Sequence, residues 1–128
     1  MKRHEMLLTI ASEECAEIQQ AVSKMLRFGG NATHPDFPGK TNGMQVIEEY
    51  YQLEAVIEML IDENVLLSLT SEDRCRIMAN KKSKVEKYLG ISRNLGLLDE
   101  ENMSVRLDLN QMAAVVRNFS DEGGVGNG

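Results

Sequence analysis

Two carboxylates lie among apolar side chains in the stretch ASEECAEIQQAVSKMLRFGG, residues 11–30. At about 100° per residue on a helix, Glu14 and Glu17 share an arc with Ile10 and Ala21. Burying one unpaired carboxylate costs several kcal/mol, which is comparable to the net stability of a whole domain. Either these side chains extend outward along a solvated edge of the helix, or a counter-ion compensates their charge.

The stretch VIEEYYQLEAVIEML, residues 46–60, brings further carboxylates onto apolar faces. On the helical wheel Glu54 lies close to the centre of the main apolar arc, and Glu49 lies on a second apolar flank. Glu48 points in another direction, so we expect it to be exposed. The interior of a helical protein would thus receive three or four carboxylates.

A later segment shows the same pattern with the opposite sign of charge. Lys81 and Lys84 share one arc with Ile77 and Tyr88. Such lysines either form structural ion pairs with inward carboxylates or converge on a bound polyanion.

A hard divalent cation would compensate the excess negative charge. Mg²⁺ prefers oxygen ligands and commonly retains waters and substrate phosphate oxygens. Carboxylates at positions i and i+3 of one helix, facing a similar set on another, could hold it, while nearby lysines contact phosphates. This combination favours phosphate-anhydride chemistry, in which water attacks phosphorus and metal neutralises the leaving pyrophosphate. The chain has no Glu-x-x-His pair for a ferritin-like di-iron site and no GxxxxGK[ST] phosphate loop.

Hydrophobic periodicity predicts the helices that must position these side chains. The first covers residues 4–28. A loop rich in Gly and Pro, residues 29–43, leads to a second helix that ends near Asn64. Asn42 and Gln45 match a capping box at the start of this second helix.

The third helix is expected to begin at the capping residues Thr70 and Asp73 and to stop at Gly90. No strand-like alternation is evident, Trp is absent, and eight Met favour an aliphatic core. The fold class is therefore all-α, a helical bundle with three main helices and a short C-terminal helix. The expected domains are a helical core over residues 1–90, a C-terminal extension with the short helix over 91–119, and a flexible tail over 120–128.

Four segments, in this order, resemble the MazG-like all-α nucleoside triphosphate pyrophosphohydrolases, in particular small phage-type members. EECAE at residues 13–17 resembles the EExxE signature of their first helix, and EEYYQLEAVIEML is similar to their ExxD helix. SKMLRFG before the loop and KVEKYL in the third helix are also similar. The resemblance covers residues 5–90 and implies Mg²⁺-dependent cleavage of a (d)NTP to (d)NMP and pyrophosphate, with Mn²⁺ as a possible substitute.

Carried over by position, the resemblance implies metal ligands at Glu14, Glu17 and Glu49. The family's Asp falls on Gln52, which can offer a carbonyl but no charge. Glu54 could take over as a ligand, the site could work with three carboxylates, or catalysis could be lost. Glu17 is the candidate for orienting or deprotonating the attacking water, with Glu14 as the alternative. The residues expected to contact the substrate are Lys24, Arg27, Lys81, Lys84 and Tyr88.

The expected partners follow from charge and from the resemblance. A net charge of −6 disfavours a nucleic-acid polymer or an anionic membrane as a partner. The resemblance implies a (d)NTP substrate and a homodimer or homotetramer. We expect a cytoplasmic protein, in the host cytoplasm if phage-encoded. The alternative function is a non-catalytic helical protein that binds a nucleotide or a partner through a degenerate metal site.

Overall fold

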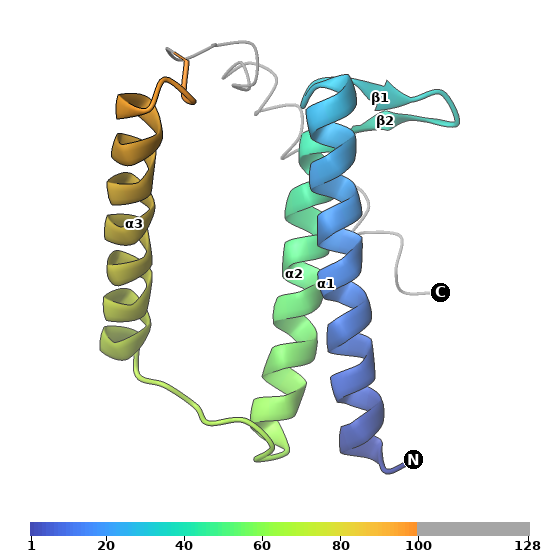
Figure 1. Cartoon of the computed structure of the whole chain (residues 1–128). Coiled ribbons are helices and arrows are strands. Elements are labelled where there is room, and N and C mark those ends of the chain that lie inside the picture. Colours follow the sequence, from blue (N-terminus) through green and yellow to red (C-terminus); the bar gives the residue numbers. More distant parts are fainter. Residues whose placement is uncertain (100–128) are drawn as a thin grey trace. The chain divides into compact units, whose positions relative to one another are not determined.

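The computed structural model describes residues 1–99, which form two units, 1–65 and 66–99, each considered by itself. Helices account for 72% of the structure, so the protein is mostly helical, with one small two-stranded sheet. The predicted short C-terminal helix and tail lie outside the described residues. The first unit contains α1 (Arg3–Phe28), β1 (Thr33–His34), β2 (Phe37–Thr41) and α2 (Asn42–Asp62), and the second contains α3 (Ser71–Asn94) (Figure 1).

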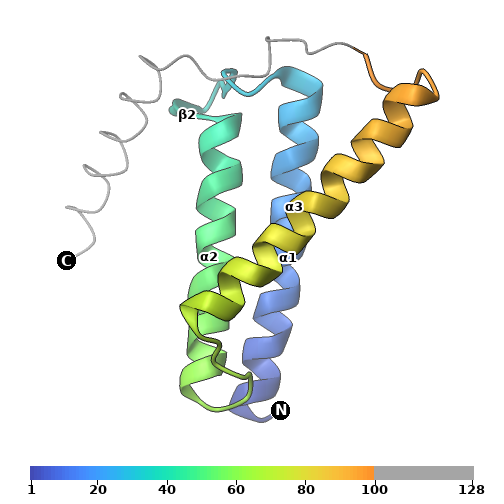
Figure 2. The same ribbon diagram turned by 90° about the vertical axis from the view of Figure 1, so that its left-hand side faces the viewer.

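Helices α1 and α2 lie side by side and antiparallel, as Figures 1 and 2 show. At one end Arg3 Nε contacts Glu63 Oε1 at 2.6 Å, which joins the start of α1 to the end of α2. At the other end the Asn42 side-chain amide donates to the Gly29 carbonyl at 2.9 Å. The two contacts lie at opposite ends of a single register, in which Glu17 meets Glu49.

The face that α2 turns toward α1 is the flank that contains Glu49. Glu49 is 7% exposed and Leu60 is fully buried, whereas Ile47 and Tyr50 on the main apolar arc are each 49% exposed. The main arc is therefore not the face that packs against α1. Since Glu54 lies about 140° round the helix from Glu49, it belongs to a different face of α2.

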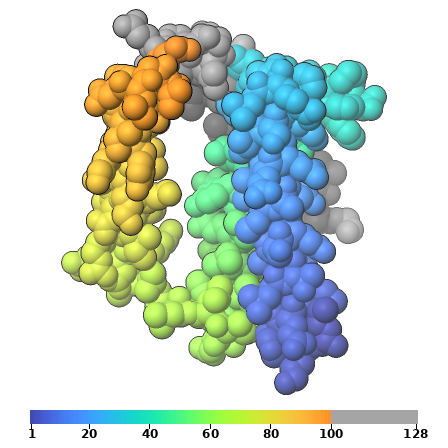
Figure 3. All heavy atoms as spheres, viewed as in Figure 1, coloured from blue at the N-terminus to red at the C-terminus, as the bar shows by residue number. Residues whose placement is uncertain are grey.

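A β-hairpin replaces the loop predicted between the first two helices. Strand β1 pairs antiparallel with β2, and His34 faces Phe37 across the turn formed by Pro35 and Asp36. The expectation of no strands was wrong here, because a two-stranded ribbon needs no apolar alternation. Proline is favoured at the second position of a tight turn, which Pro35 occupies here. In the space-filling view the hairpin atoms project sideways from the end of α1 (Figure 3).

The N-cap of α2 is Thr41, not Asn42 as predicted. The Thr41 hydroxyl accepts from the Met44 backbone N–H at 3.1 Å, while Asn42 is used to bond Gly29. The capping-box prediction was wrong because the Asn42 side chain bonds the Gly29 carbonyl at the end of α1 instead.

Substituting Thr41→Ala is expected to lower the free energy of unfolding by about 1 kcal/mol, because the Met44 N–H loses its partner. Urea unfolding followed by far-ultraviolet circular dichroism measures this change. The control is Thr33→Ala, an exposed strand residue whose side chain caps no helix. Equal midpoints for the two variants would contradict the assigned cap.

Helix α3 begins as predicted but ends later. The Thr70 hydroxyl accepts from the Asp73 backbone N–H at 3.1 Å, which confirms the predicted start. The helix continues through Gly90 to Asn94, so the predicted stop was wrong. A helix-interior Gly costs only about 1 kcal/mol, and the stop is provided by Gly96, whose φ is +71°.

Candidate metal centre

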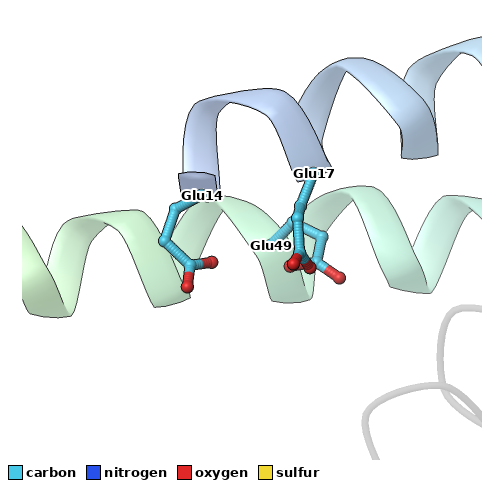
Figure 4. A group of neighbouring side chains, drawn as sticks. All are labelled: Glu14, Glu17 and Glu49. Carbon is cyan, nitrogen blue, oxygen red and sulfur yellow. The ribbon is translucent and has the colours of Figure 1, made fainter. Parts of the chain in front are cut away.

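Three carboxylates from two helices meet in the first unit. Glu14 and Glu17 extend from α1 and Glu49 from α2, to the same side (Figure 4). One carboxylate oxygen from each lies within 4.8 Å of the others. The three-carboxylate group that the resemblance implied therefore forms, because Glu14 and Glu17 are three residues apart on α1 and α2 runs antiparallel beside them. We call this group the acidic cluster.

The negative charge of the acidic cluster has no compensating cation among residues 1–99. None of the three carboxylates forms an ion pair with Lys, Arg or His in that part of the chain. The Oε2 atoms of Glu14 and Glu49 are buried and accept no hydrogen bond. Buried polar atoms are rarely left without a partner. A cation bound to these two oxygens would compensate their negative charge.

Burial raises the pKa of Glu49 above its ordinary value of 4.5. The Glu17 carboxylate adds to this by repulsion and by a hydrogen bond, and Glu14 contributes further repulsion. A hydrogen bond with the Gln45 side chain acts in the opposite direction. Without a cation, a proton on Glu49 relieves the repulsion within the acidic cluster.

The raised pKa of Glu49 makes the free energy of unfolding of the metal-free protein depend on pH. Because the folded-state pKa of Glu49 is raised, the folded state binds more protons than the unfolded state between 4.5 and that raised value. The free energy of unfolding of the wild type, relative to Glu49→Gln, is therefore expected to fall as the pH rises through this window. Urea unfolding with a chelator from pH 4.5 to 8 measures the difference, and parallel profiles would contradict it.

The other predicted ligands lie outside the acidic cluster. Gln52 is exposed, and its side-chain amide lies 3.5 Å from Glu48 Oε1. Glu54 is half-buried on another face of α2. Glu48 was expected to be exposed, which was wrong, because it is half-buried beside Lys40, with Nζ 2.6 Å from Oε2. The ligand roles of Gln52 and Glu54 stay predictions.

The predicted substrate-contacting residues fall in both units. In the first unit Lys24 is half-buried on α1, and exposed Arg27 lies over the Phe28 ring at 5.1 Å. Lys81, Lys84 and Tyr88 are exposed on α3, in the second unit. Their contact with a substrate stays a prediction.

The sequence interpretation missed Gln45 as a member of the site. It was assigned to a helix cap, but its side chain acts on the Glu49 carboxyl and lowers its pKa. The sequence feature that could have identified Gln45 is its position, four residues before Glu49 and on the same face of the helix.

Comparisons of the chain with family models, with curated proteins and with solved structures find no match. The MazG-like resemblance therefore depends on the quoted motifs alone. Among the described helices, none is long and apolar enough to cross a membrane.

Proposed function

We propose that the protein is a Mg²⁺-dependent nucleoside triphosphate pyrophosphohydrolase that converts a (d)NTP to (d)NMP and pyrophosphate. The observation that supports this most is the acidic cluster of Glu14, Glu17 and Glu49, which is partly buried and has no cation partner in the described chain. Three carboxylates around a point match the ligands of a hard divalent ion that also binds phosphate oxygens. The MazG-like motifs name the same three residues.

The residues present fit a divalent ion. The unpartnered Oε2 atoms of Glu14 and Glu49 offer lone pairs from opposite helices, and Glu17 adds a third carboxylate. Bound there, Mg²⁺ would stabilise the negative charge that develops on the phosphates. The packing of α1 against α2, in which Leu7, Ala21 and Leu60 are buried, brings the three carboxylates together before any ligand is bound.

The neighbouring carboxylates of Glu17 and Glu49 differ in burial and therefore in role. Glu49 is buried, whereas Glu17 is exposed and accessible to water. Glu17 is thus suited to take the proton of the attacking water as its oxygen bonds to phosphorus and the link between the α and β phosphates breaks. Glu14 and Glu49 are suited to hold the ion.

Hydrolysis of the eight common (d)NTPs with Mg²⁺, followed by detection of monophosphate and pyrophosphate, tests the proposal. We expect turnover of at least one triphosphate, and loss of turnover when a chelator removes the metal. A folded preparation that hydrolyses none of the eight, and in which Glu14→Ala behaves identically, would contradict the proposal.

A second function, non-catalytic nucleotide binding, is favoured by Gln52, which replaces a charged ligand of the family and is bonded to Glu48 instead. Thermal unfolding with a non-hydrolysable triphosphate separates the two. Stabilisation that requires Mg²⁺ supports the working site. Stabilisation that is equal without metal supports the degenerate binder.

We also propose that the protein acts in the cytoplasm as a homodimer or homotetramer. Ile47, Tyr50 and Met59 on α2 are 40–49% exposed in the single chain. Apolar side chains of this size favour burial against another surface. Light scattering coupled to size-exclusion chromatography measures the mass, and a monomer at micromolar concentration would contradict the expectation.

A further inference from the structure

A pocket lies at the end of the first unit where α1 meets the hairpin. Its volume is about 980 Å³, which is at the upper end of the roughly 300–1,000 Å³ that small-molecule sites occupy. The lining comes from the C-terminal part of α1, both strands and the first turn of α2. Its side chains include Lys24, Phe28, His34, Phe37, Lys40 and Gln45.

Aromatic rings form part of the pocket wall and remain accessible. The ring centroids of His34 and Phe37 are 5.9 Å apart, with the planes inclined by 45°. Both side chains are more than half exposed, so their ring faces are accessible to a ligand. Exposed rings beside an open volume are suited to stack on a planar aromatic ligand.

The hydrogen bonds of the hairpin leave one donor of His34 for a ligand. His34 Nδ1 accepts from the Asp36 backbone N–H at 3.1 Å, which in the neutral imidazole places the proton on Nε2. The Asn42 amide, in contrast, is already used to bond Gly29. A heterocycle with an acceptor nitrogen or carbonyl at its edge would match the Nε2–H donor.

The charges of the pocket favour an anionic ligand. Lys24 is half-buried and has no ion-pair partner among residues 1–99. A half-buried ammonium group without a counter-charge attracts phosphate or carboxylate. Lys40, which pairs with Glu48, adds no net charge.

Gln45 belongs both to the pocket lining and to the surroundings of Glu49 in the acidic cluster. Its side chain lines the pocket and acts on the Glu49 carboxyl, whose pKa it lowers. The two positions are one helical turn apart, about 6 Å along α2. A ligand with a planar ring at one end and phosphates at the other could therefore occupy both places at once.

We propose that the pocket between α1, the hairpin and α2 holds the nucleobase of the substrate, with His34 and Phe37 as stacking residues. The sugar and phosphates then extend past Gln45 toward the acidic cluster, and Lys24 contacts the anionic part. This inference rests on the proposed function, because it names the part of the (d)NTP that the pocket recognises.

The test uses the eight common (deoxy)nucleoside 5′-monophosphates without metal, so that binding is read independently of hydrolysis. Amide chemical shifts of the full chain should change for residues of the hairpin, with at least one monophosphate. Phe37→Ala and His34→Ala should each weaken this binding by about 5- to 100-fold. Tyr51→Ala, an exposed aromatic that does not line the pocket, is the matched control and should bind as the wild type does.

Two results separate this inference from the proposed function. If the wild type hydrolyses no triphosphate but a monophosphate shifts the hairpin amides, the pocket assignment is supported and the enzymatic proposal fails. If the wild type hydrolyses a triphosphate and Phe37→Ala leaves KM unchanged, the pocket assignment is overturned and the enzymatic proposal stands. No hairpin shift with any of the eight monophosphates would also overturn the pocket assignment.

Discussion

Replacing Glu17 by Gln is expected to lower kcat for triphosphate hydrolysis by about two to four orders of magnitude, with little change in stability. Glutamine has the same volume and can still accept a hydrogen bond, but it cannot take a proton from water. Because Glu17 is exposed on α1, the substitution removes no core contact. Initial rates at saturating Mg²⁺, together with a circular dichroism spectrum, measure both parts of the prediction.

The matched control is Glu13→Gln, on the same helix but outside the acidic cluster and exposed to solvent. It removes the same charge from the chain and should keep the wild-type kcat. Glu14→Gln, in comparison, is expected to raise the Mg²⁺ concentration needed for half-maximal activity, since Glu14 is assigned to the ion. If Glu17→Gln retains wild-type kcat, Glu17 is not the base, and a large kcat effect at Glu14 would transfer the role to it.

Mg²⁺ is expected to stabilise the wild-type protein and to lose this effect in Glu49→Gln. An ion that binds only the folded state adds about 2.7 kcal/mol at a hundredfold excess over its Kd. Glu49 supplies a buried carboxylate with an unpartnered Oε2, so its neutral replacement removes both a ligand and the repulsion that the ion relieves. In the presence of a chelator at pH 8, the variant should therefore unfold at a higher temperature than the wild type.

Thermal unfolding with and without Mg²⁺ measures both effects. Relative to the wild type, Glu49→Gln should unfold at a higher temperature without metal and gain less stability from Mg²⁺. Glu58→Gln, an exposed position on the same helix, is the control and should respond to Mg²⁺ as the wild type does. A wild type that Mg²⁺ does not stabilise, or a Glu49→Gln variant that it stabilises equally, would remove Glu49 from the metal site.

The sequence was most informative where a residue's position on a helical wheel decides its surroundings. The predicted first helix differs from α1 by one residue at its start. Glu14, predicted to point inward, is half-buried, whereas Glu17, predicted on the same inward arc, is exposed. The wheel could not choose between the two apolar faces of α2. That choice depends on which face meets α1, and the structure selects the flank with Glu49.

Local competition for hydrogen bonds limited the remaining predictions. Asn42 matched a cap, yet its amide bonds the end of α1, and the neighbouring Thr41 caps α2 instead. Gly90 matched a helix stop, yet the left-handed residue that ends α3 is Gly96. The hairpin has no apolar alternation to reveal it, so the pairing of Lys40 with Glu48 was not predicted.

A crystal of the full chain grown with Mn²⁺, examined by anomalous diffraction, tests most directly whether the acidic cluster holds a divalent ion. The expected result is an anomalous peak bounded by the carboxylates of Glu14, Glu17 and Glu49. Glu14 and Glu17 extending into bulk solvent, with no peak between them and Glu49, would contradict the metal site and the hydrolysis proposed from it.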